Sequence, residues 1–81
     1  MLVKLNNSQK RVVGKKQTLN VIEDGKAKIV YLAEDIDKNI YNEIYQSSKD
    51  NNIDLITVES KMKLGRACGI DVSAACAALL K

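Results

Sequence analysis

Residues 70–80 read Ile-Asp-Val-Ser-Ala-Ala-Cys-Ala-Ala-Leu-Leu, and the structure of this stretch decides the fold. Its alanines favour a helix, because alanine has the highest helix propensity. The chain before it, however, alternates extended apolar runs with amphipathic segments, and an α/β alternation requires a strand here. Small side chains suit a central strand with helices on both faces. Since propensity is a weak guide against tertiary context, we predict a strand over Val72–Leu80.

Three further strands are expected before it. Lys10–Val13 has the pattern of a short strand that closes at Gly14. Lys28–Ala33 is a nearly continuous apolar run, which is typical of a strand buried on both faces. Ile53–Val58 is the third. The poorly patterned opening around Asn6–Ser8 is expected to form a helical turn or two.

Three helices are expected between the strands, over Lys15–Asp24, from Asp35 or Asp37 to a break at Lys49–Asn52, and over Lys61–Cys68. Asp and Ser are good N-cap residues, so Asp35 or Asp37 caps the second helix and Ser60 the third. Gly25 and Gly69 stand where a helix should end. The order of elements predicts a three-layer α/β/α sandwich with a four-stranded mixed sheet, as a single domain over residues 1–81.

The composition argues against several functional classes. The 81 residues are 46% apolar and include no histidine. A Ser–His or Cys–His nucleophile is therefore excluded, no carboxylate pair stands beside a plausible nucleophile, and an enzyme is not expected. Cys68 and Cys76 fit no zinc or redox motif, so we interpret them as buried apolar residues and expect no metal or cofactor. The longest apolar run, Ile29–Ala33, is too short for a bilayer span and no signal peptide is evident, so we expect a cytoplasmic protein without a membrane partner.

Charge is unevenly distributed along the chain. Residues 1–28 carry a formal charge of +5, residues 29–60 carry −5 and residues 61–81 carry +3. If the fold brings the two outer blocks together, a basic face results, which indicates a nucleic-acid partner. Ordinary solvated surface explains the same asymmetry, so charge alone leaves both alternatives open.

A local conflict indicates a site at the start of the first helix. Residues 14–18, Gly-Lys-Lys-Gln-Thr, place two cations where the helix dipole disfavours them. Gly14 would let a phosphate backbone approach closely, and the free N–H groups of a helix start can bind phosphate oxygens. The alternative is that Lys15 and Lys16 are merely exposed, at a cost of a few tenths of a kcal/mol.

Three stretches together resemble the ribosomal protein L7Ae family: Gly14–Thr18, Leu32–Asp35 and Val58–Ile70. The set is fairly specific, since L-G-x-A-x-G follows V-x-S and G-x-K-Q stands upstream, and it is most similar to the short bacterial YbxF-type branch. The resemblance covers the chain from about Lys10 onward and implies an α/β/α sandwich whose last stretch is a strand. It also implies binding of kink-turn RNA, a bent duplex with a short bulge beside tandem sheared G·A pairs, in a ribosomal RNA or a riboswitch.

The resemblance assigns RNA binding to the helix start and to the loop before the third helix, at Gly14, Lys15, Lys16, Gln17, Asn20, Val58, Glu59, Ser60, Lys61, Met62 and Arg66. Lys16 and Gln17 would contact base edges, while Lys61, Lys63 and Arg66 would neutralise phosphates. Val58 would form the apolar surface under an extruded bulge nucleotide; the alternative is a core residue at a strand end, and the two are compatible.

The chain departs from the commoner family pattern at the helix start. That pattern has Asn-Glu where Lys16 and Gln17 stand, and Lys where Asn20 stands, although Lys-Gln is familiar from the YbxF-type branch. The departure leaves the docking surface in place but changes the expected base contacts.

From the resemblance as a whole, we expect a monomer that binds structured RNA and not DNA. A protein–protein interaction module on the same fold is the alternative, because fold does not fix function.

Overall fold

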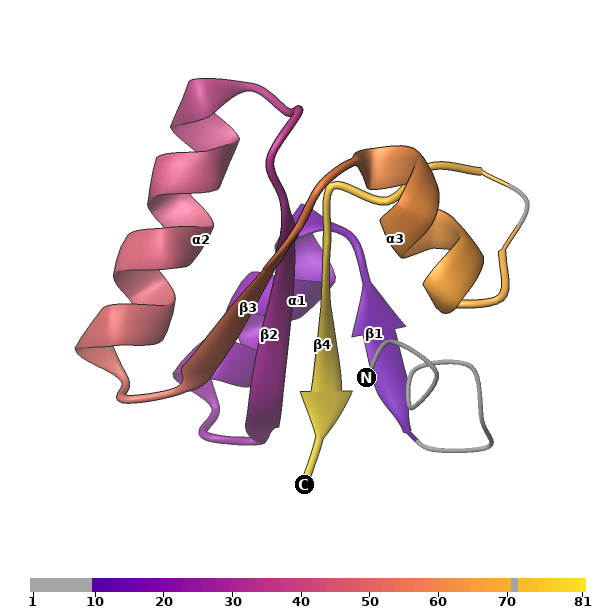
Figure 1. The fold of residues 1–81 in the computed structure, drawn as a ribbon. Helices are drawn as coiled ribbons and strands as arrows, with labels where there is room; N and C mark the ends of the chain where they lie inside the picture. Colours follow the sequence, from indigo (N-terminus) through magenta and orange to yellow (C-terminus); the bar gives the residue numbers. More distant parts are fainter. Residues whose placement is uncertain (1–9, 71) are drawn as a thin grey trace.

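The computed structural model describes residues 10–70 and 72–81, in which a four-stranded sheet lies between helices on both faces (Figure 1). The elements are β1 (Arg11–Val13), α1 (Lys15–Glu23), β2 (Ala27–Ala33), α2 (Lys38–Asp50), β3 (Asp54–Val58), α3 (Lys61–Ala67) and β4 (Cys76–Leu80). This order confirms the predicted α/β class and the mixed sheet. The helical turn expected around Asn6–Ser8 lies outside the described residues.

The sheet has the strand order β1-β4-β2-β3. β4 pairs antiparallel with both β1 and β2, whereas β2 and β3 are parallel. The last strand of the chain therefore occupies the middle of the sheet, where both faces are covered. Ala77 and Leu79 face the core beneath α3, and Cys76 and Ala78 face the core beneath α1 and α2. Small residues leave space for close approach from both layers, which is why the alanines form a strand here.

The two helical layers pack on opposite faces of this sheet (Figure 1). Ile22 of α1 and Ile44 of α2 are fully buried in one core cluster, and Leu64 and Cys68, at α3, are fully buried in the other. The three-layer α/β/α sandwich is thus confirmed. The predicted helix ends are confirmed as well, because the N–H groups of Gly25 and Gly69 donate back to the last turns of α1 and α3.

The final strand is shorter than predicted. β4 begins at Cys76, so the prediction of a strand from Val72 was wrong for four residues. The backbone of this segment is used elsewhere: the Ala74 N–H donates to the carbonyl of Lys61 at 3.0 Å, at the start of α3. Val72 is 69% exposed. The segment crosses α3 before it enters the sheet, and sequence periodicity could not show that crossing.

Candidate nucleic-acid interface

Both segments predicted to bind RNA lie at one edge of the sheet, where β1, β2 and β3 end and β4 begins (Figure 1). Backbone hydrogen bonds of 2.9 Å join each segment to a central strand: the Gly14 N–H donates to the Cys76 carbonyl at β4, and the Glu34 N–H, just after β2, donates to the Val58 carbonyl. A third bond of 2.9 Å, from the Ala33 N–H to the Ala75 carbonyl, connects the two central strands at this edge. Gly14 directly follows β1 and Val58 ends β3, and these are the two outermost strands of the sheet. Three strand spacings of about 4.8 Å each therefore separate the two residues. The edge therefore holds both segments in a fixed relation.

At the start of α1, the backbone is open to an anion. Gly14 has φ 105° and ψ 160°, a conformation that essentially only glycine adopts, and a Cβ added there would meet nothing within 4 Å. No side chain caps this helix end, and its first turn contains no acidic residue. The positive end of the helix dipole is consequently exposed beside free space, which is the arrangement that binds phosphate in many proteins.

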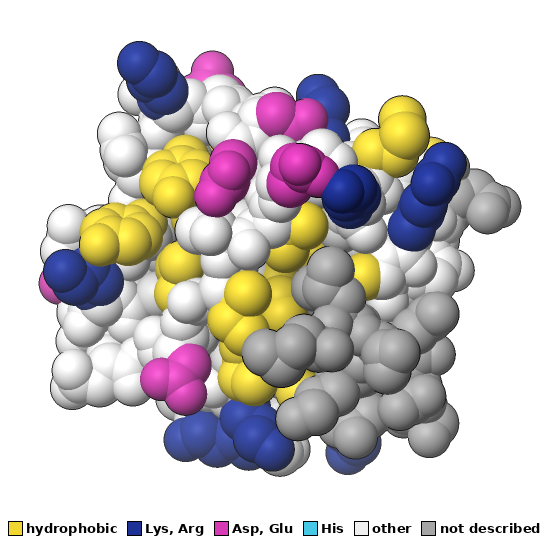
Figure 2. All heavy atoms as spheres, viewed as in Figure 1, with side chains coloured by type: hydrophobic (Ala, Val, Ile, Leu, Met, Phe, Trp, Pro, Cys, Tyr) yellow, Lys and Arg dark blue, Asp and Glu magenta, His cyan; other side chains and the backbone are white. Residues whose placement is uncertain are grey.

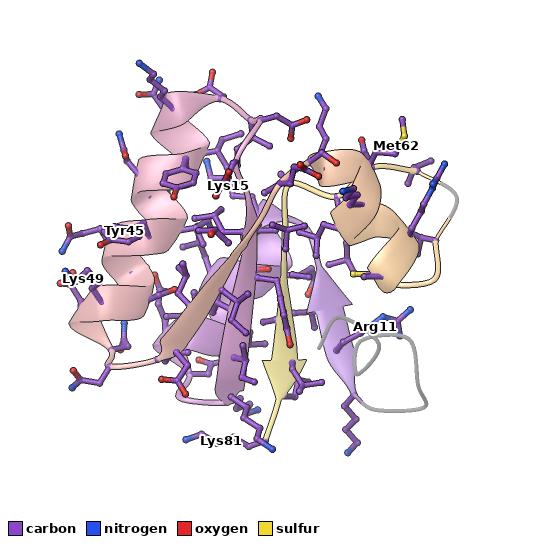
Figure 3. All side chains as sticks on the ribbon, viewed as in Figure 1. Arg11, Lys15, Tyr45, Lys49, Met62 and Lys81 are labelled. Atoms are coloured by element: carbon purple, nitrogen blue, oxygen red, sulfur yellow. The ribbon has the colours of Figure 1, made fainter. Side chains whose placement is uncertain are left out.

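The two lysines of this helix start have different environments. The Nζ of Lys15 lies 3.0 Å from Oε1 of Glu43 on α2, and both side chains are about half exposed (Lys15 is labelled in Figure 3). Lys16 is exposed, and no carboxylate in residues 10–70 and 72–81 pairs with it. Glu43 relieves part of the conflict between the cations and the helix dipole. Gln17 and Asn20 are exposed on the same helix.

The loop between β3 and α3 is held by capping interactions. Ser60 caps α3 as predicted, and its hydroxyl accepts from the Lys63 N–H at 3.1 Å. The ammonium group of Lys63 also pairs with Glu59, four residues earlier. The hydrogen bond and positive charge of Lys63 hold the pKa of Glu59 below its ordinary value. Lys63, predicted to neutralise phosphate, is thus paired within the chain, while Lys61 and Arg66 remain exposed.

The carboxylate of Asp35 joins this loop to the end of β2. Its Oδ1 accepts from the backbone N–H of Lys61 at 2.7 Å, across 26 positions of sequence. Asp37, by contrast, accepts from the Asn39 N–H at 2.7 Å and is the N-cap of α2. Of the two predicted caps, Asp37 caps the second helix and Asp35 anchors the third. The ion pair of Glu59 with Lys63 also offsets one negative charge that this edge would present to a polyanion, whereas Asp35 keeps its charge.

Val58 lies in the core. It is 6% exposed and packs in the cluster beneath α3, so the structure agrees with the alternative of a strand-end core residue. The exposed apolar side chains nearby are Met62 at 60% and Val72 at 69%. With Arg66, Ile70 and Ser73 they line a hollow of about 270 Å³ beside the start of α3 (Met62 is labelled in Figure 3). Sequence reasoning missed Val72, because it placed that residue inside the last strand.

The fold brings the two basic blocks of the sequence together, since β1 pairs with β4. Their cations nevertheless separate between two ends of the molecule. Lys15, Lys16, Lys61 and Arg66 belong to elements that begin at the edge just described, whereas Lys81 lies at the opposite end, hydrogen-bonded through its N–H to the carbonyl of Lys26 (Figures 2 and 3). A single continuous basic face is therefore not formed by the described residues.

Comparison with known proteins identifies the chain. Residues 1–81 match the model of the ribosomal protein L7Ae/L30e/S12e/Gadd45 family. The chain belongs to this family. It is 40% identical to an RNA-binding protein of Geobacillus sp. (strain WCH70) over 78 residues, which cover 96% of this chain and 95% of that protein. It is 37% identical to RNA-binding protein YbxF of Geobacillus stearothermophilus over the same shares, which confirms the predicted resemblance.

Solved structures agree with this assignment to the L7Ae family. The chain superposes on the 15.5kD RNA binding protein of Giardia lamblia with a TM-score of 0.89 and 27% identity, covering 99% of this chain and 68% of that one. A Bacillus halodurans protein of unknown function, 18% identical, shares the fold with a TM-score of 0.87 and covers 99% of this chain and 80% of that one.

The sequence of this family member predicts two buried cysteines, and it predicts neither a metal site nor a membrane span. Cys68 and Cys76 are both fully buried, as predicted, and burial raises the pKa of each thiol. Within the described ranges, no three His, Cys, Asp or Glu side chains gather as metal ligands would. The helices of that part of the chain are also too short or too polar to cross a bilayer.

Removing Asp35 should loosen the β3–α3 loop of this L7Ae-family chain. We expect Asp35→Ala to lower the free energy of unfolding by about 1 kcal/mol, since a hydrogen bond to a charged acceptor is lost at an exposed site. It should also speed hydrogen exchange at the Lys61 amide, measured by NMR. Asp37→Ala is the matched control: it removes an N-cap at a similar cost but should leave the Lys61 amide protected. Equal exchange in both variants would refute the anchoring role.

Proposed function

We propose that this protein binds kink-turn RNA as a non-enzymatic RNA-binding protein. The observation that carries the proposal is the uncapped start of α1, with its open Gly14 and unpaired Lys16, at the same sheet edge as the anchored loop of Glu59–Met62. The names of the relatives support RNA as the ligand, because several of them are called RNA-binding proteins. The specificity for a kinked duplex is our inference from the arrangement of the two segments.

A bent duplex would suit two separated contacts at one edge. A phosphate can approach the backbone of Gly14 and accept hydrogen bonds from the first turn of α1. Lys16 can then donate to guanine O6 and N7, and Gln17 offers both a donor and an acceptor to the base edges of the G·A pairs. Asn20 lies one turn further on the face of Lys16. A straight duplex that contacts this helix would turn away from the β3–α3 loop.

The bulge of the RNA would meet the apolar side chains of the loop. Because Val58 is buried, the surface for an unstacked nucleotide is formed by Met62 and Val72 above the hollow beside α3. Lys61 and Arg66 stand exposed at this helix and can neutralise neighbouring phosphates. The backbone of Lys61 is fixed from two sides, so its side chain starts from a defined position.

A protein–protein interaction module is the second candidate, and one observation favours it. Met62 and Val72 together expose two large apolar side chains, which could pack against another protein. The two functions differ in their response to salt. RNA binding through lysines and arginines weakens steeply as salt is added, whereas an apolar protein interface is nearly insensitive to it.

The decisive experiment compares a kink-turn RNA with a straight duplex of equal length. We expect tighter binding of the kink-turn RNA, and a plot of log affinity against log salt with a slope of roughly −2, about 0.9 for each of Lys61 and Arg66, the two cations assigned to phosphates. Affinities can be measured by calorimetry at several salt concentrations. Equal affinity for both RNAs would show that the protein binds RNA only through non-specific charge interactions. Absence of binding to either RNA would favour the interaction module.

A further inference from the structure

Helix α2 carries a ladder of two tyrosines and a lysine that the interface above does not use. Tyr41, Tyr45 and Lys49 follow one another at intervals of four residues. The two rings lie nearly parallel, with centroids 6.3 Å apart and an angle of 13° between their planes. The Nζ of Lys49 lies 5.4 Å from the centroid of the Tyr45 ring. We call these three side chains the tyrosine ladder; Tyr45 and Lys49 are labelled in Figure 3.

Packing accounts for only part of the ladder. Tyr41 is half-buried and packs against the core cluster beneath α1 and α2. Tyr45 is 39% exposed and belongs to neither core cluster of the described residues. Figure 2 shows hydrophobic side chains on the surface over α2. Tyr45 thus keeps 39% of its surface in water.

The lysines and Glu43 of α2 lie on different sides of the helix. At 100° per residue, Lys38 and Lys49 lie about 20° and 40° around the axis from Tyr45. Glu43 lies about 160° away and pairs with Lys15 on the side of α1. The charged residues of α2 that lie nearest to the tyrosines are therefore lysines. Acidic side chains also lie on this face of the molecule (Figure 2), and Glu34, just after β2, lines the hollow beside Tyr41.

We propose that the tyrosine ladder binds unpaired nucleotides of RNA. Parallel aromatic rings beside cations form a stacking platform for bases of any type, and each stacked base adds substantially to affinity. A base would stack on the face of Tyr45 that Lys49 now covers, and Lys49 would move to the neighbouring phosphate. The flexible lysine stem allows that exchange.

The position of α2 agrees with this ligand. The helix begins at the same sheet edge as the kink-turn interface and runs away from it (Figure 1). Lys38 and Lys49 are eleven positions apart, or about 16 Å at 1.5 Å per residue. Beside Tyr41, a hollow of about 380 Å³ includes Asn42, whose amide can hydrogen-bond to a base. A single strand that leaves a bound kink could follow this side of α2. This path of the strand, which starts from a bound kink-turn, rests on the proposed function.

The test uses a fluorescently labelled octauridylate and the full chain. We expect it to bind, and to quench tyrosine fluorescence, which comes from three tyrosines without any tryptophan. Because Tyr31 is 1% exposed, quenching would report Tyr41 and Tyr45. Tyr45→Ala should weaken binding by about 5- to 150-fold, the range for loss of one stacked base. Tyr45→Phe should retain it, and Gln46→Ala, on another side of α2, is the matched control.

The outcomes separate this proposal from the kink-turn function. A blunt kink-turn RNA should bind wild type and Tyr45→Ala equally, and an added eight-nucleotide overhang should increase affinity only in wild type. If wild type binds the kink-turn RNA but neither the octauridylate nor the overhang, the ladder proposal is overturned alone. If it binds the octauridylate through Tyr45 without preferring kinked RNA, only the kink-turn function fails. A change in sedimentation of the free protein on Tyr45→Ala would identify a protein contact and also overturn the proposal.

Discussion

Gly65→Ala should destabilise the protein by about 3 kcal/mol or more, at the upper end of the range for overpacking. Gly65 lies inside α3 and is buried, and a Cβ at this position would stand 2.1 Å from the carbonyl oxygen of Val72 and 3.1 Å from the Cα of Ser73. Both are backbone atoms, so no side-chain rotation can remove the overlap. The Ala74 N–H, bonded to Lys61, restrains the segment on one side.

The sign of this effect distinguishes packing from propensity. In an exposed helix, replacing glycine by alanine stabilises by roughly 0.5–1 kcal/mol. Here the crossing of α3 by the segment before β4 should reverse that sign. Urea unfolding measures the difference, and Arg66→Ala, at the exposed neighbouring position, should stay within about 0.5 kcal/mol of wild type. A Gly65→Ala variant that is more stable than wild type would contradict the close approach of the Val72 and Ser73 backbone to α3.

The same crossing marks the limit of what the sequence could predict for the fold. Alternation of apolar runs with amphipathic segments gave all four strands and three helices of the described chain, because each pattern reflects burial of that element itself. The beginning of β4 was misplaced because residues 72–75 are positioned by α3. The backbone of this segment contacts α3, which is a different element of the chain. The local periodicity of apolar residues carries no information about such contacts.

For the candidate interface, the chemistry of single residues was easier to predict than their pairing. The N-cap role of Ser60 follows from residue type and is confirmed. The ion pair of Lys15 with Glu43 joins two helices across 28 positions, and the anchor from Asp35 to Lys61 joins two loops. Acidic residues at the end of a strand were a signal for such anchors, but the sequence does not say which N–H group each one reaches.

The difference between the two adjacent lysines leads to the second large effect. Lys16→Ala should weaken binding of kink-turn RNA by about 5- to 150-fold, equivalent to about 1–3 kcal/mol, because Lys16 is assigned to the base edges. The loss should shrink on an RNA whose sheared G·A pairs are replaced, since that contact is then already absent. The free protein should become slightly more stable, because Lys16 lies in the first turn of α1 without a carboxylate partner among the described residues.

Lys15→Ala is the matched control, one residue away on the same helix start. Its Nζ already lies 3.0 Å from a carboxylate oxygen of Glu43, so part of its charge is neutralised before any RNA arrives. We expect Lys15→Ala to cost at most about 1 kcal/mol of stability, as for other exposed ion pairs, and to weaken both RNAs alike. Calorimetry with the two RNAs and urea unfolding of both variants measure these effects. If Lys16→Ala destabilised the free protein and left RNA affinity unchanged, Lys16 would be structural. The uncapped start of α1 would then need another explanation, because Lys16, which opposes the helix dipole without a carboxylate partner among the described residues, would have no role in RNA binding.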